Sequence, residues 1–141
     1  MLNGMYKITM SETKLSLPAN KQPTLRVITR PNDANPKGDI FGGWLMSQID
    51  VAGAIAAISA AKGPVSTVAV KELQFIHPLY AHDIVSFYTE VTGVGTTSVT
   101  VAIEVYAQRQ MGMKNCVIKI SDALLVYVAV SEPGKKRKIS K

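Results

Sequence analysis

The sequence has few of the side chains from which many enzymes build their sites, with one cysteine and two histidines in 141 residues. A single cysteine cannot form an internal disulfide, so the chain has no disulfide framework. With so few cysteine and histidine ligands, no metal site is predicted. Cys116 lies among Val117, Ile118 and Ile120, and we interpret it as a small buried hydrophobic residue.

Several enzyme motifs are also missing. The sequence contains no glycine-rich P-loop, no dinucleotide-binding fingerprint and no Gly-x-Ser-x-Gly nucleophile elbow. Near the N-terminus there is no continuous apolar segment with a cleavage site, so we expect a cytoplasmic protein. A chain of this length builds one compact domain, and its composition points to no bound cofactor.

Composition and charge divide the chain into three parts. Residues 1–23 are irregular and are interpreted as a flexible N-terminal arm. Residues 24–131 form the predicted domain, and residues 132–141 form a basic tail within a chain of net charge +6. Such a tail is either a solvated segment or an anion site for a phosphorylated ligand. A nuclear-import signal has the same composition.

One long apolar segment, residues 41–61, has the length of a membrane span. Ser47, Gln48 and Asp50 lie inside it, and an acidic group in mid-bilayer is costly. The segment therefore predicts a buried helix over residues 43–61, ended by the Lys-Gly-Pro sequence that follows, and no membrane association. Its apolar residues cover nearly every face, so other protein must surround it.

The other segments are rich in valine, isoleucine, threonine and tyrosine, which is typical of strands. The predicted strands are residues 24–30, 65–77, 83–94, 97–108 and 116–130. Gly93 and Gly95 predict a tight hairpin, and residues 109–115 predict a looser connection. The order predicts an α+β domain in which a five-stranded antiparallel sheet curls around one long helix. An open sheet edge favours pairing of two copies.

This order of elements is that of the hotdog fold, and a local motif narrows the match. The run N-x-x-G-D-I-F-G-G-W begins at Asn35 and is followed by M-S-Q-I-D, which ends at Asp50. It closely resembles the bacterial acyl-CoA thioesterases of the YciA type. Residues 66–85 and 122–130 look like later strands of that family, and the similarity covers residues 24–138. The resemblance implies hydrolysis of acyl-CoA thioesters, often with broad acyl-chain tolerance, with coenzyme A present as part of the substrate.

The same resemblance implies an assembly in which the active site lies at a dimer interface. It implies double-hotdog dimers, their further association as trimers of dimers, and an essential carboxylate on the helix, which the motif places at Asp50. It also suggests that Asn35 points at the attacking water or the thioester, and these two residues of one cavity can belong to different chains. His77 and His82 stand where the family is expected to have other residues, and neither is required.

Asp50 is the only ionisable residue between Asp39 and Lys62. A carboxylate in an apolar helix is costly unless it is hydrogen-bonded, paired or close to water. One interpretation is a structural aspartate that pairs across a dimer. We favour a catalytic carboxylate that activates water as a general base or attacks the thioester as a nucleophile.

The neighbours of this carboxylate give further candidates. Gly42 and Gly43 open the helix, and their free N–H groups could hold the oxyanion that forms during hydrolysis. The alternative is that small residues are needed where the helix enters a crowded sheet. Asp39 is expected to cap the helix. Ser66 and Thr67 could hydrogen-bond the carboxylate or water, although β-propensity alone also explains a threonine in a strand.

The phosphates of coenzyme A need cations, and the tail offers them if it folds back on the domain. The main candidates are Lys135, Lys136, Arg137 and Lys138. Weaker candidates are Arg109, Lys114 and the turn that contains Gly95, Thr96 and Ser98.

Two other hotdog functions remain as alternatives. A dehydratase or hydratase would need a histidine partnered with an acid, whereas His77 is far along the chain from Asp50. A non-catalytic acyl-CoA-binding protein would bind the same ligand without hydrolysis. A DNA-binding regulator would need a helix-turn-helix, for which the first 23 residues are too few and too irregular, so no nucleic-acid partner is predicted.

Overall fold

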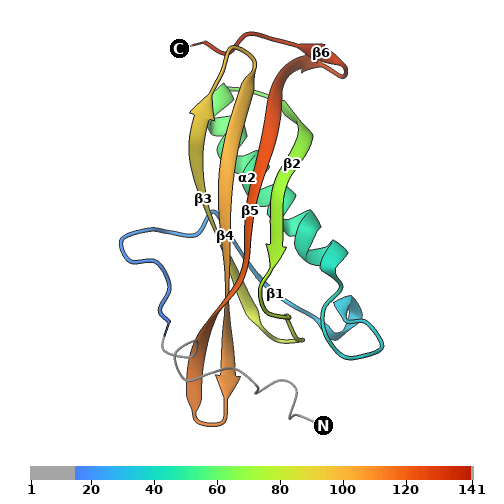
Figure 1. Cartoon of the computed structure of the whole chain (residues 1–141), viewed down its shortest axis with the longest axis vertical. Helices are drawn as coiled ribbons and strands as arrows, with labels where there is room; N and C mark the ends of the chain where they lie inside the picture. The colour runs from blue at the N-terminus through green and yellow to red at the C-terminus, as the bar shows by residue number, and fades with distance from the viewer. Residues whose placement is uncertain (1–14, 141) are drawn as a thin grey trace.

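The structure is a computed structural model that describes residues 15–140 (Figure 1). Its elements in chain order are β1 (Leu25–Ile28), the 3-10 helix η2 (Pro31–Asp33), α2 (Gly42–Ala61), β2 (Val65–Phe75), β3 (Ile84–Val94), β4 (Ser98–Met111), β5 (Lys114–Glu132) and β6 (Lys135–Lys136). The predicted α+β arrangement of one long helix and five antiparallel strands is confirmed, and β6 adds a short sixth strand.

The sheet has the strand order β1-β3-β4-β5-β2, and each neighbouring pair is antiparallel. The first two strands in the sequence therefore lie at opposite edges. Helix α2 connects them by crossing one face of the sheet, where it contacts β2, β3, β4 and β5 (Figure 1). This crossing places the middle of α2 beside the edge strand β2.

Helix α2 begins one residue before the predicted start and ends at the predicted residue. Lys62 ends it in the left-handed conformation, with its N–H bonded to the carbonyl of Ile58. The face that lies on the sheet is made mostly of small residues, which allow close packing. Its buried residues are Leu45, Ile49, Ala52, Gly53, Ala57 and Ala61.

The opposite side of α2 is also apolar, and the chain leaves it uncovered. Met46, Val51, Ile55 and Ile58 are each more than 40% exposed. The helix has the length and mean hydropathy of a membrane span, as the sequence indicated, but the core helix of a soluble protein meets the same criteria. The prediction that protein surrounds α2 is thus confirmed only for the side that packs on the sheet of the same chain.

The connection between the last two long strands differs from the prediction. Residues 109–115 are not a loose loop, because β4 and β5 stay paired as far as Met111 and Lys114. The turn uses Gly112 at φ +65°, a left-handed conformation that glycine adopts without strain. Cys116 is buried in this hairpin, as predicted.

The basic tail folds back on the domain, which was the condition for a role in anion binding. The short strand β6 pairs with the end of β5. Ile139 is 8% exposed, and its N–H donates to the carbonyl oxygen of Thr96 at 2.8 Å. In the N-terminal arm, residues 1–14 lie outside the described residues, and Leu15 forms a β-bridge with Val117.

A buried ion pair joins β4 to the turn before β3. Arg109 donates to both carboxylate oxygens of Asp83, at 2.9 Å and 2.7 Å, and also to the carbonyl of Pro78 at 3.0 Å. Both charged side chains are at most 4% exposed. The prediction that Arg109 offers a cation to coenzyme A is wrong, since the buried carboxylate already engages its charge.

We predict that Asp83→Ala lowers the free energy of unfolding by about 3–5 kcal/mol, because it leaves the guanidinium of Arg109 buried without its counter-ion. Urea unfolding at one fixed protein concentration measures the change. The control is Glu132→Ala, which breaks the exposed pair with Lys135 and should change stability by less than about 1 kcal/mol. Equal effects of the two variants would show that burial does not decide the strength of the pair.

Candidate active site

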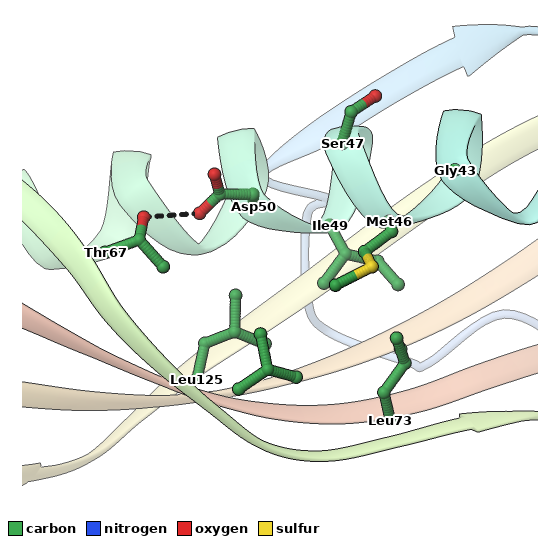
Figure 2. A pocket seen from close by; sticks show the side chains of 9 residues that line it. Gly43, Met46, Ser47, Ile49, Asp50, Thr67, Leu73 and Leu125 are labelled. Carbon is green, nitrogen blue, oxygen red and sulfur yellow. Dashed lines mark hydrogen bonds between the residues drawn. The ribbon is translucent and has the colours of Figure 1, made fainter.

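Asp50 lies in the middle of α2 with its carboxylate directed to the edge strand β2 (Figure 2). The hydroxyl of Thr67, on β2, donates a hydrogen bond of 2.7 Å to Oδ1 of Asp50. This contact is one of the possibilities that the sequence left open for Thr67.

A second hydroxyl, which the sequence analysis missed, reaches the same residue. Tyr127 on β5 donates to the main-chain oxygen of Asp50 at 2.8 Å and lies 3.2 Å from its Oδ1. Burial raises the pKa of Tyr127 well above the ordinary value of tyrosine, and the charge of Asp50 raises it further. The phenol therefore keeps its proton and acts as a donor at neutral pH.

The carboxylate borders a pocket of about 370 Å³ between α2 and the sheet. The lining residues are Gly43, Met46, Ser47, Ile49, Asp50, Thr67, Val70, Leu73 and Leu125, most of which Figure 2 labels. Most of this lining is aliphatic, and Asp50 is half-buried at its edge. Among residues 15–140 no ion pair to Asp50 is found, and a pair across a dimer, which was the structural alternative, would need a charge from a second copy.

In the described part of the chain, the N–H groups of Gly42 and Gly43 in the first turn of α2 have no backbone acceptor. Its N-cap is Phe41, which makes no side-chain cap, and the turn contains no acidic residue. The predicted cap by Asp39 is therefore wrong. Gly42 and Gly43 do open the helix, and a Cβ at Gly43 would meet no heavy atom within 4 Å. The start of α2 is thus open to a ligand. Its N–H groups can bind an anion only if a ligand can reach them in this way.

Asn35 and Asp39 do not line the pocket beside Asp50. The side-chain oxygen of Asn35 accepts the N–H groups of Lys37 and Gly38, at 2.8 Å and 3.1 Å, and so closes the turn before α2. Asp39 borders a different pocket, of about 340 Å³, at the start of α2. Within a single chain, these two candidates therefore lie apart from the Asp50 carboxylate.

That different pocket also contains His77, beside Phe75 and Gly42. A nitrogen of the His77 ring lies 3.0 Å from the carbonyl oxygen of Lys119. His77 does not border the Asp50 pocket, so the arrangement of a hotdog dehydratase is not found there. Within residues 15–140 no group of three or more histidine, cysteine, aspartate or glutamate side chains could hold a metal ion.

The cationic candidates are partly brought together. The turn of Gly95 to Ser98 lies against the tail, because Thr96 accepts the N–H of Ile139. The side chains of Lys135, Lys136 and Lys138 are exposed at this end of the domain. Lys114 begins β5 at the opposite end, so it does not join them (Figure 1).

Arg137 has a structural role in the tail. Its guanidinium donates to the carbonyl oxygens of Val130 and Ala61, each at 3.0 Å, and to that of Pro64 at 3.3 Å. It thereby ties the tail to the end of α2 and satisfies a carbonyl that the helix leaves free. These bonds fix the tail, while the neighbouring lysines carry the accessible charge.

Comparisons with known proteins agree with this architecture. Residues 37–114 match the model of the thioesterase superfamily. The acyl-CoA thioester hydrolase YciA of Escherichia coli strain K12 is 44% identical over 117 residues, which cover 80% of this chain and 86% of that protein.

Two solved structures are similar over most of their length. One is a hexameric hotdog-fold thioesterase of Campylobacter jejuni, with a TM-score of 0.83 and 42% identity, covering 87% of this chain and 93% of that one. The other is a hexameric broad-specificity acyl-coenzyme A thioesterase, solved as an aspartate-to-alanine mutant. Its TM-score is 0.81 with 37% identity, covering 86% of this chain and 88% of that one.

Proposed function

This chain belongs to the thioesterase superfamily and is a hotdog-fold acyl-CoA thioester hydrolase, and we propose that Asp50 drives its reaction. The observation that carries the role of Asp50 is a carboxylate held at the edge of an aliphatic pocket by two hydroxyl donors. Such a pocket suits an acyl chain, and the carboxylate lies where the chain would meet its thioester.

Two chemical routes use the carboxylate. As a general base, Asp50 takes a proton from water, and the resulting hydroxide attacks the thioester carbonyl carbon. As a nucleophile, it attacks that carbon directly and forms an anhydride that water then cleaves. In both routes the carbon–sulfur bond breaks, the thiolate of coenzyme A leaves and takes up a proton, and a carboxylic acid is released.

The oxyanion donors must come from outside the immediate surroundings of Asp50. Gly43 precedes Asp50 by two helical turns, which places their backbones about 10 Å apart along the axis of α2. A thioester carbonyl that reacts at Asp50 cannot reach the helix start of the same chain. We therefore assign Gly42, Gly43 and Asn35 to the same reaction through a second copy of the chain.

The edge strand β2 offers a way to bring those parts together. Antiparallel pairing of β2 with β2 of a second copy about its middle residue, Val70, places Thr67 of one chain opposite Leu73 of the other, two residues from Phe75. Phe75 packs on Gly42, since a Cβ built there would meet its ring at 3.6 Å. The start of the second copy's helix would then approach Asp50.

Exposed apolar residues support this pairing. Self-association is in line with its hexameric relatives, and its uncovered apolar surfaces support a place where a second copy binds. On the edge strand these are Val68 and Val70, at 56% and 41% exposure, and on α2 they are Val51, Ile55 and Ile58. We propose a dimer through β2 and α2 and a trimer of such dimers.

The tail is the proposed site for the phosphates of coenzyme A. Ala61, to which Arg137 is bonded, lies roughly 16 Å along α2 from Asp50. A pantetheine arm separates the thioester from the phosphates, so a phosphate site is expected at a distance from the carboxylate. The exposed lysines and the turn of Gly95, Thr96 and Ser98 meet that requirement. Function without a cofactor and a cytoplasmic location stay predictions from the sequence.

We predict that Asp50→Asn lowers kcat for acyl-CoA hydrolysis by about 100-fold to 10,000-fold, because asparagine keeps the shape but cannot accept the proton or attack. Release of free thiol, measured across short, medium and long acyl-CoAs, gives the rates. The melting temperature and the assembly should stay close to those of the wild type. A variant that turns over at the wild-type rate would remove Asp50 from the mechanism, and binding of acyl-CoA by the wild type without thiol release would indicate the non-catalytic alternative.

Pairing through β2 predicts that Val68→Lys reduces the mass in solution and the turnover together, because a charge on the edge strand opposes pairing and the site needs two copies. Light scattering and the thiol assay measure both quantities over a range of protein concentrations, and higher concentration should restore both. Val94→Lys, at an exposed valine on β3, is the control. Full turnover by a monomer would contradict the shared site.

The phosphate site predicts that replacing Lys135, Lys136 and Lys138 together by alanine raises KM about tenfold with little change in kcat. The difference from the wild type should shrink as salt is added. Arg137 is left in place because it holds the tail. Lys114→Ala, at the far end of β5, is the matched control and should leave KM unchanged, and an unchanged KM in the triple variant would place the phosphates elsewhere.

A further inference from the structure

The two oxygens of the Asp50 carboxylate are treated differently by the fold. Oδ1 is within hydrogen-bonding distance of two hydroxyls, Thr67 at 2.7 Å and Tyr127 at 3.2 Å. Among the residues that the structure describes, no donor is found for Oδ2. One oxygen is therefore held by the protein while the other is available to water or a thioester.

Tyr127 also fixes the helix backbone at the same residue. Its hydroxyl lies 2.8 Å from the main-chain oxygen of Asp50, to which it donates. The ring is fully buried at 0% exposure, so its position is set by the core and not by solvent. A rigid side chain thus ties both the main chain and the carboxylate of Asp50 to the central part of the sheet.

Gly53 provides the space for this hydroxyl. A Cβ at Gly53 would overlap the oxygen of Tyr127. Glycine inside a helix is less favourable than alanine, because it loses more conformational freedom on folding. An alanine at position 53 facing a phenylalanine at position 127 would also fill this part of the core. That pair would have better helix propensity and no buried phenol. The pair Gly53 and Tyr127 is therefore best explained by the hydroxyl itself.

We infer that Tyr127 is a positioning residue for thioester hydrolysis, which holds Oδ1 of the Asp50 carboxylate so that Oδ2 stays available to water or the thioester. The inference rests on the proposed role of Asp50. The phenol keeps its proton throughout and makes no contact with the substrate. Its hydrogen bond favours the charged carboxylate over the neutral acid, and the charged form is the one that both routes need.

The direct test is Tyr127→Phe, which removes the hydroxyl and keeps the ring. We expect kcat to fall about 10-fold to 100-fold, the range for losing a hydrogen bond to a charged group. KM should change less than about twofold, since Tyr127 does not touch the substrate. The acid side of the kcat profile should move to higher pH, because a hydrogen bond to the charged form of the carboxylate is lost. Tyr88→Phe is the matched control, because Tyr88 is a buried tyrosine on another strand, β3. It should leave kcat, KM and the pH profile unchanged.

Gly53→Ala gives a second variant that keeps the tyrosine but displaces its hydroxyl. It should shift the pH profile in the same direction as Tyr127→Phe. Assays run well below the melting temperature of each variant separate this effect from loss of fold. A shifted profile in both variants supports the inference, because a purely structural role would lower the amount of active enzyme without moving its pH dependence.

The outcomes separate the two proposals. If Tyr127→Phe keeps the wild-type kcat and pH profile while Asp50→Asn is inactive, the positioning role is wrong and the role of Asp50 stands. A lower kcat with an unchanged pH profile would also overturn the positioning role and leave Tyr127 as a packing residue. If Asp50→Asn is fully active, the proposed mechanism fails whatever Tyr127→Phe does.

Discussion

The site depends on a charged group that an apolar helix can hold only with outside help. The carboxylate of Asp50 projects from a helix that is otherwise nearly free of charge, and burial of such a group without partners is unfavourable. Two hydroxyls from two strands, those of Thr67 and Tyr127, supply the partners. They stabilise the charge without neutralising it, as an ion pair would, so the carboxylate keeps its capacity to accept a proton. The packing of α2 on the sheet is what brings the three side chains together.

The same fold leaves surfaces that one chain cannot complete. Helix α2 is buried on the side of the sheet and exposes valine and isoleucine on the other, and the edge strand β2 exposes Val68 and Val70. The backbone donors at the start of α2 lie two turns away from Asp50, and one of them, Gly42, borders a different pocket. Self-association therefore has two consequences in this protein, since it covers apolar surface and also joins parts of a divided site.

Several charged residues that look available in the sequence are used to hold the fold. Arg109 is paired with Asp83 in the interior, and Arg137 donates to three carbonyl oxygens, one at the end of α2, one just after it and one on β5. A guanidinium suits this task because it carries five donors in a fixed plane. Lysines of the same tail remain exposed, so a difference in side-chain chemistry separates the residues that fasten the tail from those that can meet a phosphate.

The sequence by itself determined the elements and the central carboxylate. Apolar composition and the Lys-Gly-Pro stop located α2 to within one residue, residue patterns identified the five main strands, and a short motif indicated both the family and Asp50. It misjudged residues 109–115 and the partner of Arg109, and it had no signal for Tyr127. Asp50 and Tyr127 are 77 residues apart, and alternation along a strand tells only that a tyrosine is buried, not what its hydroxyl meets. Contacts of that kind follow from strand order and register, because these decide which distant side chains share a space in the folded chain.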